Sequence, residues 1–204
     1  MSEVIIRDAV LDVSGLPSHR FSHHSPMWWG TLGMMAIEGT VFALAIMCYF
    51  FLRSHSQTWP MGVLPPDLLW GTVALVIMLA SAVPNQLAKK AGERYDVHGV
   101  RLWVGVLILF GLALLVVRVF EFAALNVRWD SSAYGSAVWT LLGLHTAHLA
   151  TDWADSLVLE ALFFKGPLTG RRFVDVSENS MYWYFVVLSW IPIYFVLYWG
   201  ARAV

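Results

Sequence analysis

Five long apolar stretches, separated by short polar segments, constrain what this chain can fold into. They cover residues 27–52, 68–88, 102–125, 136–164 and 181–201. A bilayer core about 30 Å thick is crossed by roughly 20 mostly apolar helical residues. We therefore expect an all-α, polytopic membrane protein. It would have a cytoplasmic N-terminal segment, 1–26, followed by a transmembrane domain of five helices in a bundle, 27–204.

The composition supports a membrane location. Charged residues make up 13% of the chain and hydrophobic residues 58%, whereas a soluble domain carries about 25% charged residues. The net charge of −1 provides no basic surface for a nucleic acid. These values argue against a soluble enzyme, a disordered chain and a nucleic-acid-binding module. The single cysteine, Cys48, leaves no thiolate cluster within the chain and is expected to be a small buried apolar residue.

The basic residues predict the orientation. Cytoplasmic loops of membrane proteins carry the excess of Lys and Arg. Three segments, before the first stretch and after the second and fourth, hold nine of them: Arg7, Arg20, Lys89, Lys90, Arg94, Arg101, Lys165, Arg171 and Arg172. The opposite side holds three, Arg53, Arg128 and Arg202. The N-terminus is therefore expected in the cytoplasm. We also expect kinks at Pro84 and Pro192.

Several ionisable residues fall inside the apolar stretches. An unpaired charge there costs at least about 2.5–3.5 kcal/mol, so each such residue is expected to have a partner or a function. Near mid-depth, Glu38 stands beside Gly39, a small residue typical of a helix that packs closely against another. Glu38 is either a protonatable carboxyl in a polar crevice or a neutral acid hydrogen-bonded to a neighbouring helix, and both interpretations remain open.

Arg118 and Glu121 are three residues apart, which places them on one helical face. An internal ion pair near the outer membrane interface is the simplest interpretation. A lipid phosphate could be a third member of that pair.

The fourth stretch carries a polar stripe. His145, His148, Asp152 and Asp155 have a 3-4-3 spacing, which aligns them on one side of a helix. Such residues can bind a metal in a helical bundle, but no second helix carries histidines to complete a metal or haem site. We favour a hydrogen-bonded seam between packed helices. His19, His23 and His24 form a possible metal tract, but a simple polar segment is the favoured interpretation.

Four motifs, taken in order, resemble subunit III of the haem-copper oxidases, the cytochrome c oxidase subunit III family, in its short five-helix form. They are IEGTVF at 37–42 with YFFLR at 49–53, VFEF at 119–122, GLHTAH at 143–148, and YWYFV at 182–186. The resemblance covers nearly the whole chain. It departs at Tyr184 and Val187, where the family usually has histidine and aspartate, and at Asp152, where the family has a small residue.

The resemblance implies a non-catalytic accessory subunit in the bacterial inner membrane. Such a subunit packs on oxidase subunit I, belongs with subunits I and II, holds phospholipid in a cleft, and supports proton uptake in aerobic respiration. Haem and copper are expected in the partner subunits, and no cofactor in this chain. The residues carried over to the lipid cleft or to proton handling are Glu38, Arg118, Glu121, His145 and His148, while Asp152 and Asp155 form a divergent polar stripe. The alternatives are a nitric oxide reductase-associated subunit or a small proton-coupled transporter.

Overall fold

The structure, a computed structural model, describes residues 20–202, and over that range it contains helices and connecting loops but no strand. Its helices are listed in chain order as α1 (Pro26–Ser54), α2 (Leu68–Glu93), α3 (Val97–Ala123), α4 (Ala133–Lys165) and α5 (Gly170–Tyr194), with a 3-10 turn, η1 (Ser22–His24), before α1 and a π-helical turn, η2 (Phe195–Trp199), after α5. The all-α prediction is confirmed for this part of the chain.

Side chains that cap the first backbone N–H groups help to define where three helices begin. Ser25 accepts a hydrogen bond from the Met27 backbone N–H, and Pro26 occupies the first turn of α1, a position that lacks an N–H partner in any case. Asp96 caps α3 at Gly99, and Ser132 caps α4 at Gly135. Each cap satisfies a donor that would otherwise be unpaired.

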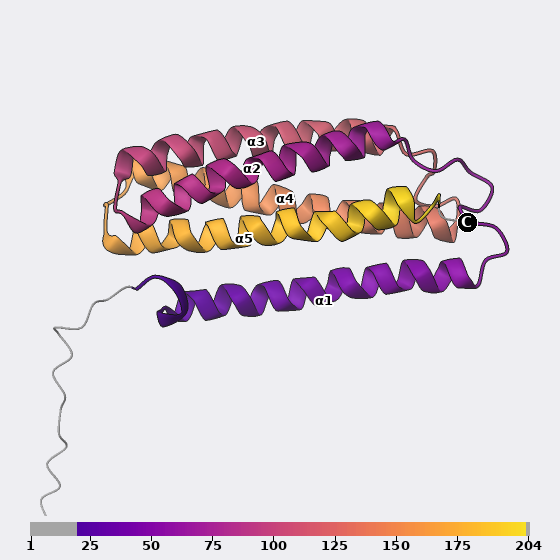
Figure 1. Ribbon diagram of the computed structural model, residues 1–204, viewed down its shortest axis with the longest axis horizontal. Helices are drawn as coiled ribbons and strands as arrows, with labels where there is room; N and C mark the ends of the chain where they lie inside the picture. Colours follow the sequence, from indigo (N-terminus) through magenta and orange to yellow (C-terminus); the bar gives the residue numbers. More distant parts are fainter. Residues whose placement is uncertain (1–19, 203–204) are drawn as a thin grey trace, which may run out of the picture.

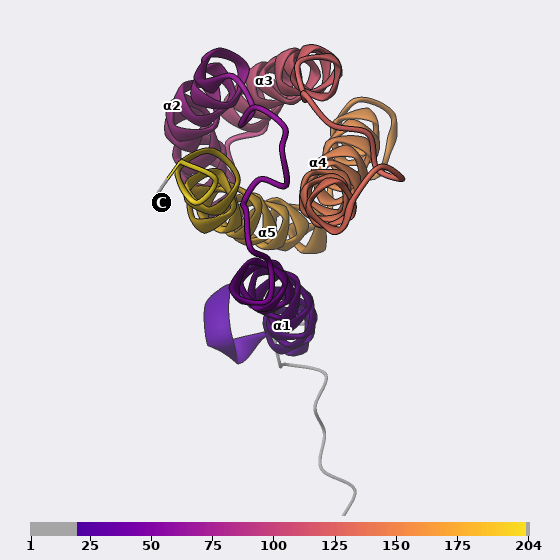
Figure 2. The ribbon, with the colours of Figure 1, turned by 90° about the vertical axis from the view of Figure 1, so that its right-hand side faces the viewer.

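Helices α2 to α5 form a four-helix bundle, and α1 lies outside it (Figures 1 and 2). Helix α1 packs on α4 and α5. Only two of its residues, Phe42 and Tyr49, are buried, and both lie in its C-terminal half. No residue in the N-terminal half of α1 is buried.

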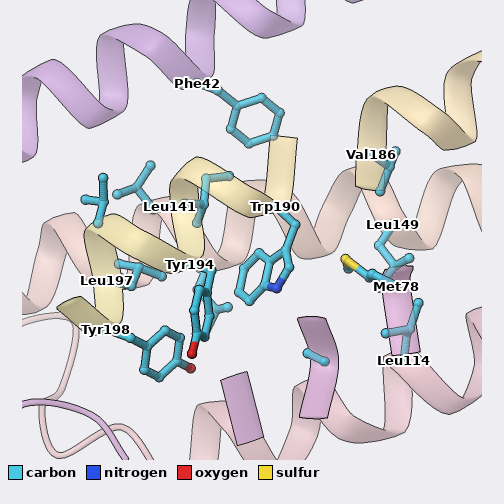
Figure 3. Packing of buried hydrophobic residues seen from close by; sticks show 14 of the residues in the cluster. Phe42, Met78, Leu114, Leu141, Leu149, Val186, Trp190, Tyr194, Leu197 and Tyr198 are labelled. Atoms are coloured by element: carbon cyan, nitrogen blue, oxygen red, sulfur yellow. The ribbon is translucent and has the colours of Figure 1, made fainter. Parts of the chain in front are cut away.

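The largest buried cluster fills the bundle around α5. Trp183, Trp190 and Tyr198 are almost completely buried there, and Figure 3 shows Trp190 and Tyr198 among Leu141, Leu197 and other side chains of the cluster. Phe42 joins the cluster from α1. A smaller cluster, at the ends where α3 and α4 meet α5, contains Val100, Val104, Phe163 and Phe173.

Four of the described helices are long and apolar enough to cross a membrane, namely α1, α2, α3 and α5 with η2. Helix α4 is as long as the others, but its polar stripe lowers its hydropathy, so it is not among them.

The predicted bounds shift most at α5. The helix begins at Gly170 rather than at 181, because its first turns are polar and do not register as an apolar stretch. Helix α3 likewise begins at Val97 rather than at 102. Pro84 and Pro192 lie inside continuous helices, and the π-helical turn starts three residues after Pro192. The predicted segment 1–26 falls mostly outside the described residues.

Candidate functional site

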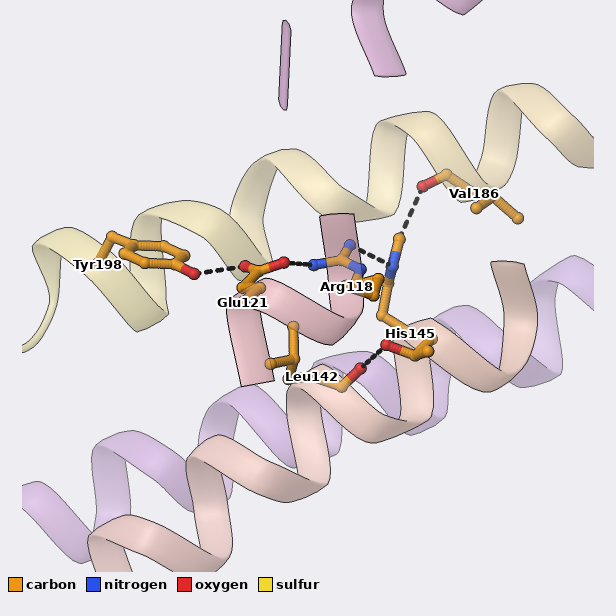
Figure 4. A network of polar contacts seen from close by, with 7 residues as sticks. Arg118, Glu121, Leu142, His145, Val186 and Tyr198 are labelled. Atoms are coloured by element: carbon orange, nitrogen blue, oxygen red, sulfur yellow. Dashed lines mark hydrogen bonds and ion pairs between the residues drawn. The ribbon is translucent and has the colours of Figure 1, made fainter. Parts of the chain in front are cut away.

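A fully buried polar network joins α3, α4 and η2 (Figure 4). Arg118 donates a hydrogen bond to Glu121 within an ion pair, and Tyr198 donates its hydroxyl to the other carboxylate oxygen of Glu121. Arg118 also donates to Nδ1 of His145 at 3.1 Å. The expected internal ion pair is thus present, with two further partners. We call these four residues the Arg118 network.

The hydrogen bonds assign the protonation of His145. Its Nε2 lies 3.0 Å from the carbonyl oxygen of Val186, which can only accept. Its Nδ1 faces an arginine, which can only donate. His145 is therefore neutral, with its proton on Nε2. The Arg118 guanidinium also stacks 3.6 Å from the centroid of the Trp190 ring, a favourable cation-π contact.

These contacts give the Arg118 network a structural character. Arg118, Glu121 and His145 are at most 1% exposed. Apart from Arg118 Nε, which has no partner in the protein, their side-chain nitrogens and oxygens bond to each other, to Tyr198 or to the Val186 carbonyl. None of the four lines the cleft described next. The arrangement compensates a buried charge pair and ties three helices together.

A cleft of about 870 Å³ lies between α1, α4 and α5. Every residue that α5 contributes to it is polar or charged, whereas α1 and α4 contribute both polar and apolar residues. Five carboxyl groups line it: Glu38, Asp152, Asp155, Asp175 and Glu178. Arg171 and Arg172 line it near the start of α5, and Arg172 contacts Asp175 at 3.4 Å. The cleft runs beside the N-terminal half of α1, where that helix is least buried.

Glu38 lies at the inner end of the cleft and contacts both other helices. Tyr182 of α5 donates its hydroxyl to Glu38 Oε2 at 2.8 Å. His148 of α4 places Nε2 3.5 Å from Glu38 Oε1. The next residue of α1, Gly39, faces the Phe185 ring of α5 at ordinary contact distance. Both carboxylate oxygens of Glu38 are therefore held from across the cleft.

Asn179 of α5 organises the polar side of the cleft. Its Nδ2 lies 3.3 Å from oxygens of Asp152, Asp155 and Ser156. Asp152 is 2% exposed, and its Oδ2 has no hydrogen-bond partner in the protein. The amide thus supplies donors between two carboxyl groups on adjacent turns of α4.

The structure divides the predicted stripe of α4 into three environments. His145 belongs to the Arg118 network, His148 faces Glu38, and Asp152 with Asp155 face Asn179. Sequence reasoning missed Tyr182, Tyr198 and Asn179 as partners. Asn179 could have been found if the polar run 177–180 had been assigned to the helix.

No group of three or more His, Cys, Asp or Glu within residues 20–202 is arranged to hold a metal ion. His23 and His24 lie in η1 and are exposed, and His19 is outside the described residues. Cys48, expected to be buried, is exposed on α1, because its side of the helix does not face the bundle.

Comparison with known proteins gives a consistent result. No family model matches the chain. Cytochrome c oxidase subunit 3 of Corynebacterium diphtheriae is 29% identical over 175 residues, covering 83% of this chain and 85% of that protein. The proteins of the same name from Alkalihalophilus pseudofirmus and Bacillus subtilis are 26% identical over 202 residues and 27% identical over 167 residues. They cover 93% and 79% of this chain, and 96% and 80% of those proteins.

These similarities cover 79–93% of the chain, and they agree with the long apolar helices of a membrane protein. They confirm the resemblance that the four motifs indicate: the chain is homologous to bacterial proteins named cytochrome c oxidase subunit 3.

Proposed function

We propose that this chain is subunit III of a haem-copper terminal oxidase, an accessory subunit without a redox centre of its own. The observation that carries the proposal is the similarity to cytochrome c oxidase subunit 3 over 83–93% of the chain. In this proposal all five helices cross the bacterial inner membrane, with the N-terminus in the cytoplasm. The chain packs on subunit I and associates with subunit II, and those partners carry the haem and copper.

The cleft provides a place for one lipid at its mouth. Arg171 and Arg172 stand at the start of α5, on the side proposed as cytoplasmic, where a phosphate headgroup would lie. Guanidinium groups bind phosphate by paired hydrogen bonds. Apolar side chains from α1 and α4, including Met27, Val158 and Leu162, line the same cleft and would contact an acyl chain.

We assign to Glu38 a role in sustained turnover of the oxidase complex. This residue stands at the inner end of the cleft, between Tyr182 and His148. A carboxyl group held there can exchange a proton with its surroundings, and proton uptake by the complex is the process we propose it supports.

The first experiment isolates the chain by a tag in mild detergent and identifies its companions. Mass spectrometry should find the haem- and copper-binding subunits, and a reduced-minus-oxidised spectrum of the same sample should show haem. Copurification of a nitric oxide reductase would reassign the partner. A solitary, colourless chain, under conditions in which a known oxidase stays intact, would support a transporter instead.

Two sets of variants test the cleft within the complex. Glu38→Gln should leave assembly intact but shorten the period of sustained turnover, whereas Glu160→Gln, a carboxyl on α4 outside the cleft, should not. Arg171→Gln with Arg172→Gln should lower the phospholipid that copurifies with the complex. Arg128→Gln, at a surface ion pair with Asp130, is the matched control. Unchanged lipid content and turnover in all of these variants would rule out both roles of the cleft.

A further inference from the structure

We infer that two carboxyl groups of α5, Asp175 and Glu178, select which phospholipid occupies the cleft. They favour a headgroup with a primary ammonium, as in phosphatidylethanolamine, over anionic and choline headgroups. The inference rests on the lipid site of the proposed function, and it adds the chemistry by which that site distinguishes one headgroup from another.

The first argument is the arrangement of charges along α5. Arg172, Asp175 and Glu178 follow one another at intervals of three residues, so they are neighbours on one face of the helix, and all three line the cleft. Arg172 and Glu178 are about 9 Å apart along the helix axis. A headgroup whose phosphate contacts Arg172 therefore has its terminal group within reach of the two carboxyl side chains.

The second argument is the buried and unpaired state of Glu178. This residue is 7% exposed, and neither of its carboxylate oxygens has a hydrogen-bond partner in the described protein. Thr31 of α1 and Lys89 of α2 interact with it only more weakly. A buried carboxyl group without a partner is costly, so a ligand that brings N–H donors to Glu178 gains binding energy there.

The third argument is the balance of charge in the cleft. Five carboxyl groups line it, against the two guanidinium groups of Arg171 and Arg172. An anionic headgroup would gain from the arginines but would be repelled by the carboxyl groups beside them. A zwitterionic headgroup matches both signs, because its phosphate contacts the arginines while its ammonium contacts Asp175 and Glu178.

Hydrogen bonding distinguishes the primary ammonium from choline. A primary ammonium has three N–H donors, and its hydrogen bonds to carboxylates are charge-assisted and therefore strong. The quaternary ammonium of choline has no N–H donor and is typically recognised by a cage of aromatic side chains. Of the described residues that line the cleft, Tyr182 is the only aromatic one, and its hydroxyl donates to Glu38. The cleft is therefore suited to ethanolamine rather than to choline.

The same surroundings favour a lipid over a lysine side chain of a partner protein. Met27 of α1 and Val158 and Leu162 of α4 line the cleft together with the carboxyl groups. Acyl chains would cover these apolar side chains, and a phosphate would use the adjacent arginines. A lysine side chain would satisfy the carboxyl groups alone and would leave both of these features unused.

Lipid retention tests the inference. The complex is reconstituted into bilayers with equal amounts of phosphatidylethanolamine, phosphatidylglycerol and phosphatidylcholine that carry the same acyl chains. It is then extracted in mild detergent, and the retained lipids are counted by mass spectrometry. Phosphatidylethanolamine should exceed each of the other two by at least about fivefold, since a charge-assisted hydrogen bond is gained.

Substitutions at Glu178 test its role in the selection. Glu178→Gln should reduce the preference to below about twofold, because the carboxylate that receives the charge-assisted bonds is lost. Glu178→Lys supplies an ammonium from the protein and should shift the preference to phosphatidylglycerol. Glu160→Gln, a carboxyl of α4 outside the cleft, is the matched control and should retain the preference of the unmodified complex.

Methylation of the lipid amine separates hydrogen bonding from charge. Phosphatidylethanolamine with one, two or three N-methyl groups keeps its positive charge while it loses N–H donors one by one. Retention should fall along this series, with the largest step at the third methyl group, which removes the last donor. Equal retention across the series would show that charge alone is recognised, and it would overturn the hydrogen-bonded ammonium site.

The remaining outcomes distinguish this inference from the proposed function. Equal retention of the three headgroups, or an unchanged preference in Glu178→Gln, would overturn the selection by α5 and leave the lipid site and the subunit III assignment intact. Absence of retained lipid in the unmodified complex would overturn the lipid site and this inference with it. Loss of a partner subunit in Glu178→Gln, with the lipid preference unchanged, would show that Glu178 pairs with a protein and not with a lipid.

Discussion

Gly71 of α2 lies directly against the ring of Tyr198, so that a Cβ at position 71 would overlap the ring atoms. Tyr198 in turn donates its hydroxyl to Glu121 of α3. The absence of a side chain at Gly71 therefore leaves space for the Tyr198 ring, and this lets the Tyr198 hydroxyl reach Glu121. Gly71 lies within a regular helix, where its backbone needs no special conformation. Glycine is required there because a side chain would prevent the close approach of Tyr198.

Gly71→Ala should displace Tyr198 and destabilise the chain by about 1–3 kcal/mol, the usual cost of overpacking a core. Thermal unfolding in mild detergent, followed by tryptophan fluorescence, measures the change. Gly143→Ala is the control, because nothing lies within 4 Å of a Cβ there. It should be neutral or slightly stabilising. Equal effects at both positions would contradict the packing of Tyr198 on α2.

The Arg118 network predicts strong coupling between its charges. Arg118→Gln leaves a buried carboxylate without its cation, and Glu121→Gln leaves a buried guanidinium without its anion. Each should cost about 3–5 kcal/mol. The double variant should lose clearly less than the sum of the two, because no uncompensated charge remains. The same cycle at the exposed Arg128 and Asp130 pair should give a coupling of about 0–1 kcal/mol. Additive losses at Arg118 and Glu121 would show that they do not interact.

Asn179→Asp tests the polar side of the cleft. The change preserves shape, but it replaces the amide donor with a third carboxyl group beside Asp152 and Asp155. The variant should be less stable by about 1–3 kcal/mol at neutral pH, and the loss should shrink as the pH falls, because protonation removes the repulsion. Detergent unfolding at several pH values measures this. Asn126→Asp, in a loop where the amide donates to the Pro65 carbonyl, should show no comparable pH dependence.

Local relationships could be predicted from the sequence, whereas contacts between distant segments could not. Arg118 and Glu121 are neighbours on one helix, so their ion pair follows from spacing alone. Glu38 and Tyr182 are 144 positions apart, and no periodicity connects them. The spacing predicts the stripe on α4, but spacing does not predict that its members face three different partners.

The polar start of α5 is the clearest limit of hydropathy. Hydropathy leaves residues 170–180 outside the predicted span 181–201, because they include Arg171, Arg172 and Glu178. In the structure these turns are helical and line the cleft. A helix that borders a polar cleft carries polar residues, and these lower the hydropathy by which membrane spans are predicted. Asn179 lies in such a stretch, so hydropathy does not assign it to a helix.

Helix α1 buries only two of its residues, and it forms one side of the cleft. Its 29 residues make about 44 Å of helix, longer than a hydrocarbon core of about 30 Å, and a helix of excess length adapts by tilting. Phe42 and Tyr49 are buried in its C-terminal half, whereas the half that borders the cleft is held through the contacts of Glu38 with Tyr182 and His148. The Arg118 network contains no residue of α1 and is left undisturbed. The α1 side of the cleft is therefore the side that a change of tilt would reach first, and Glu38 is the residue through which it would act.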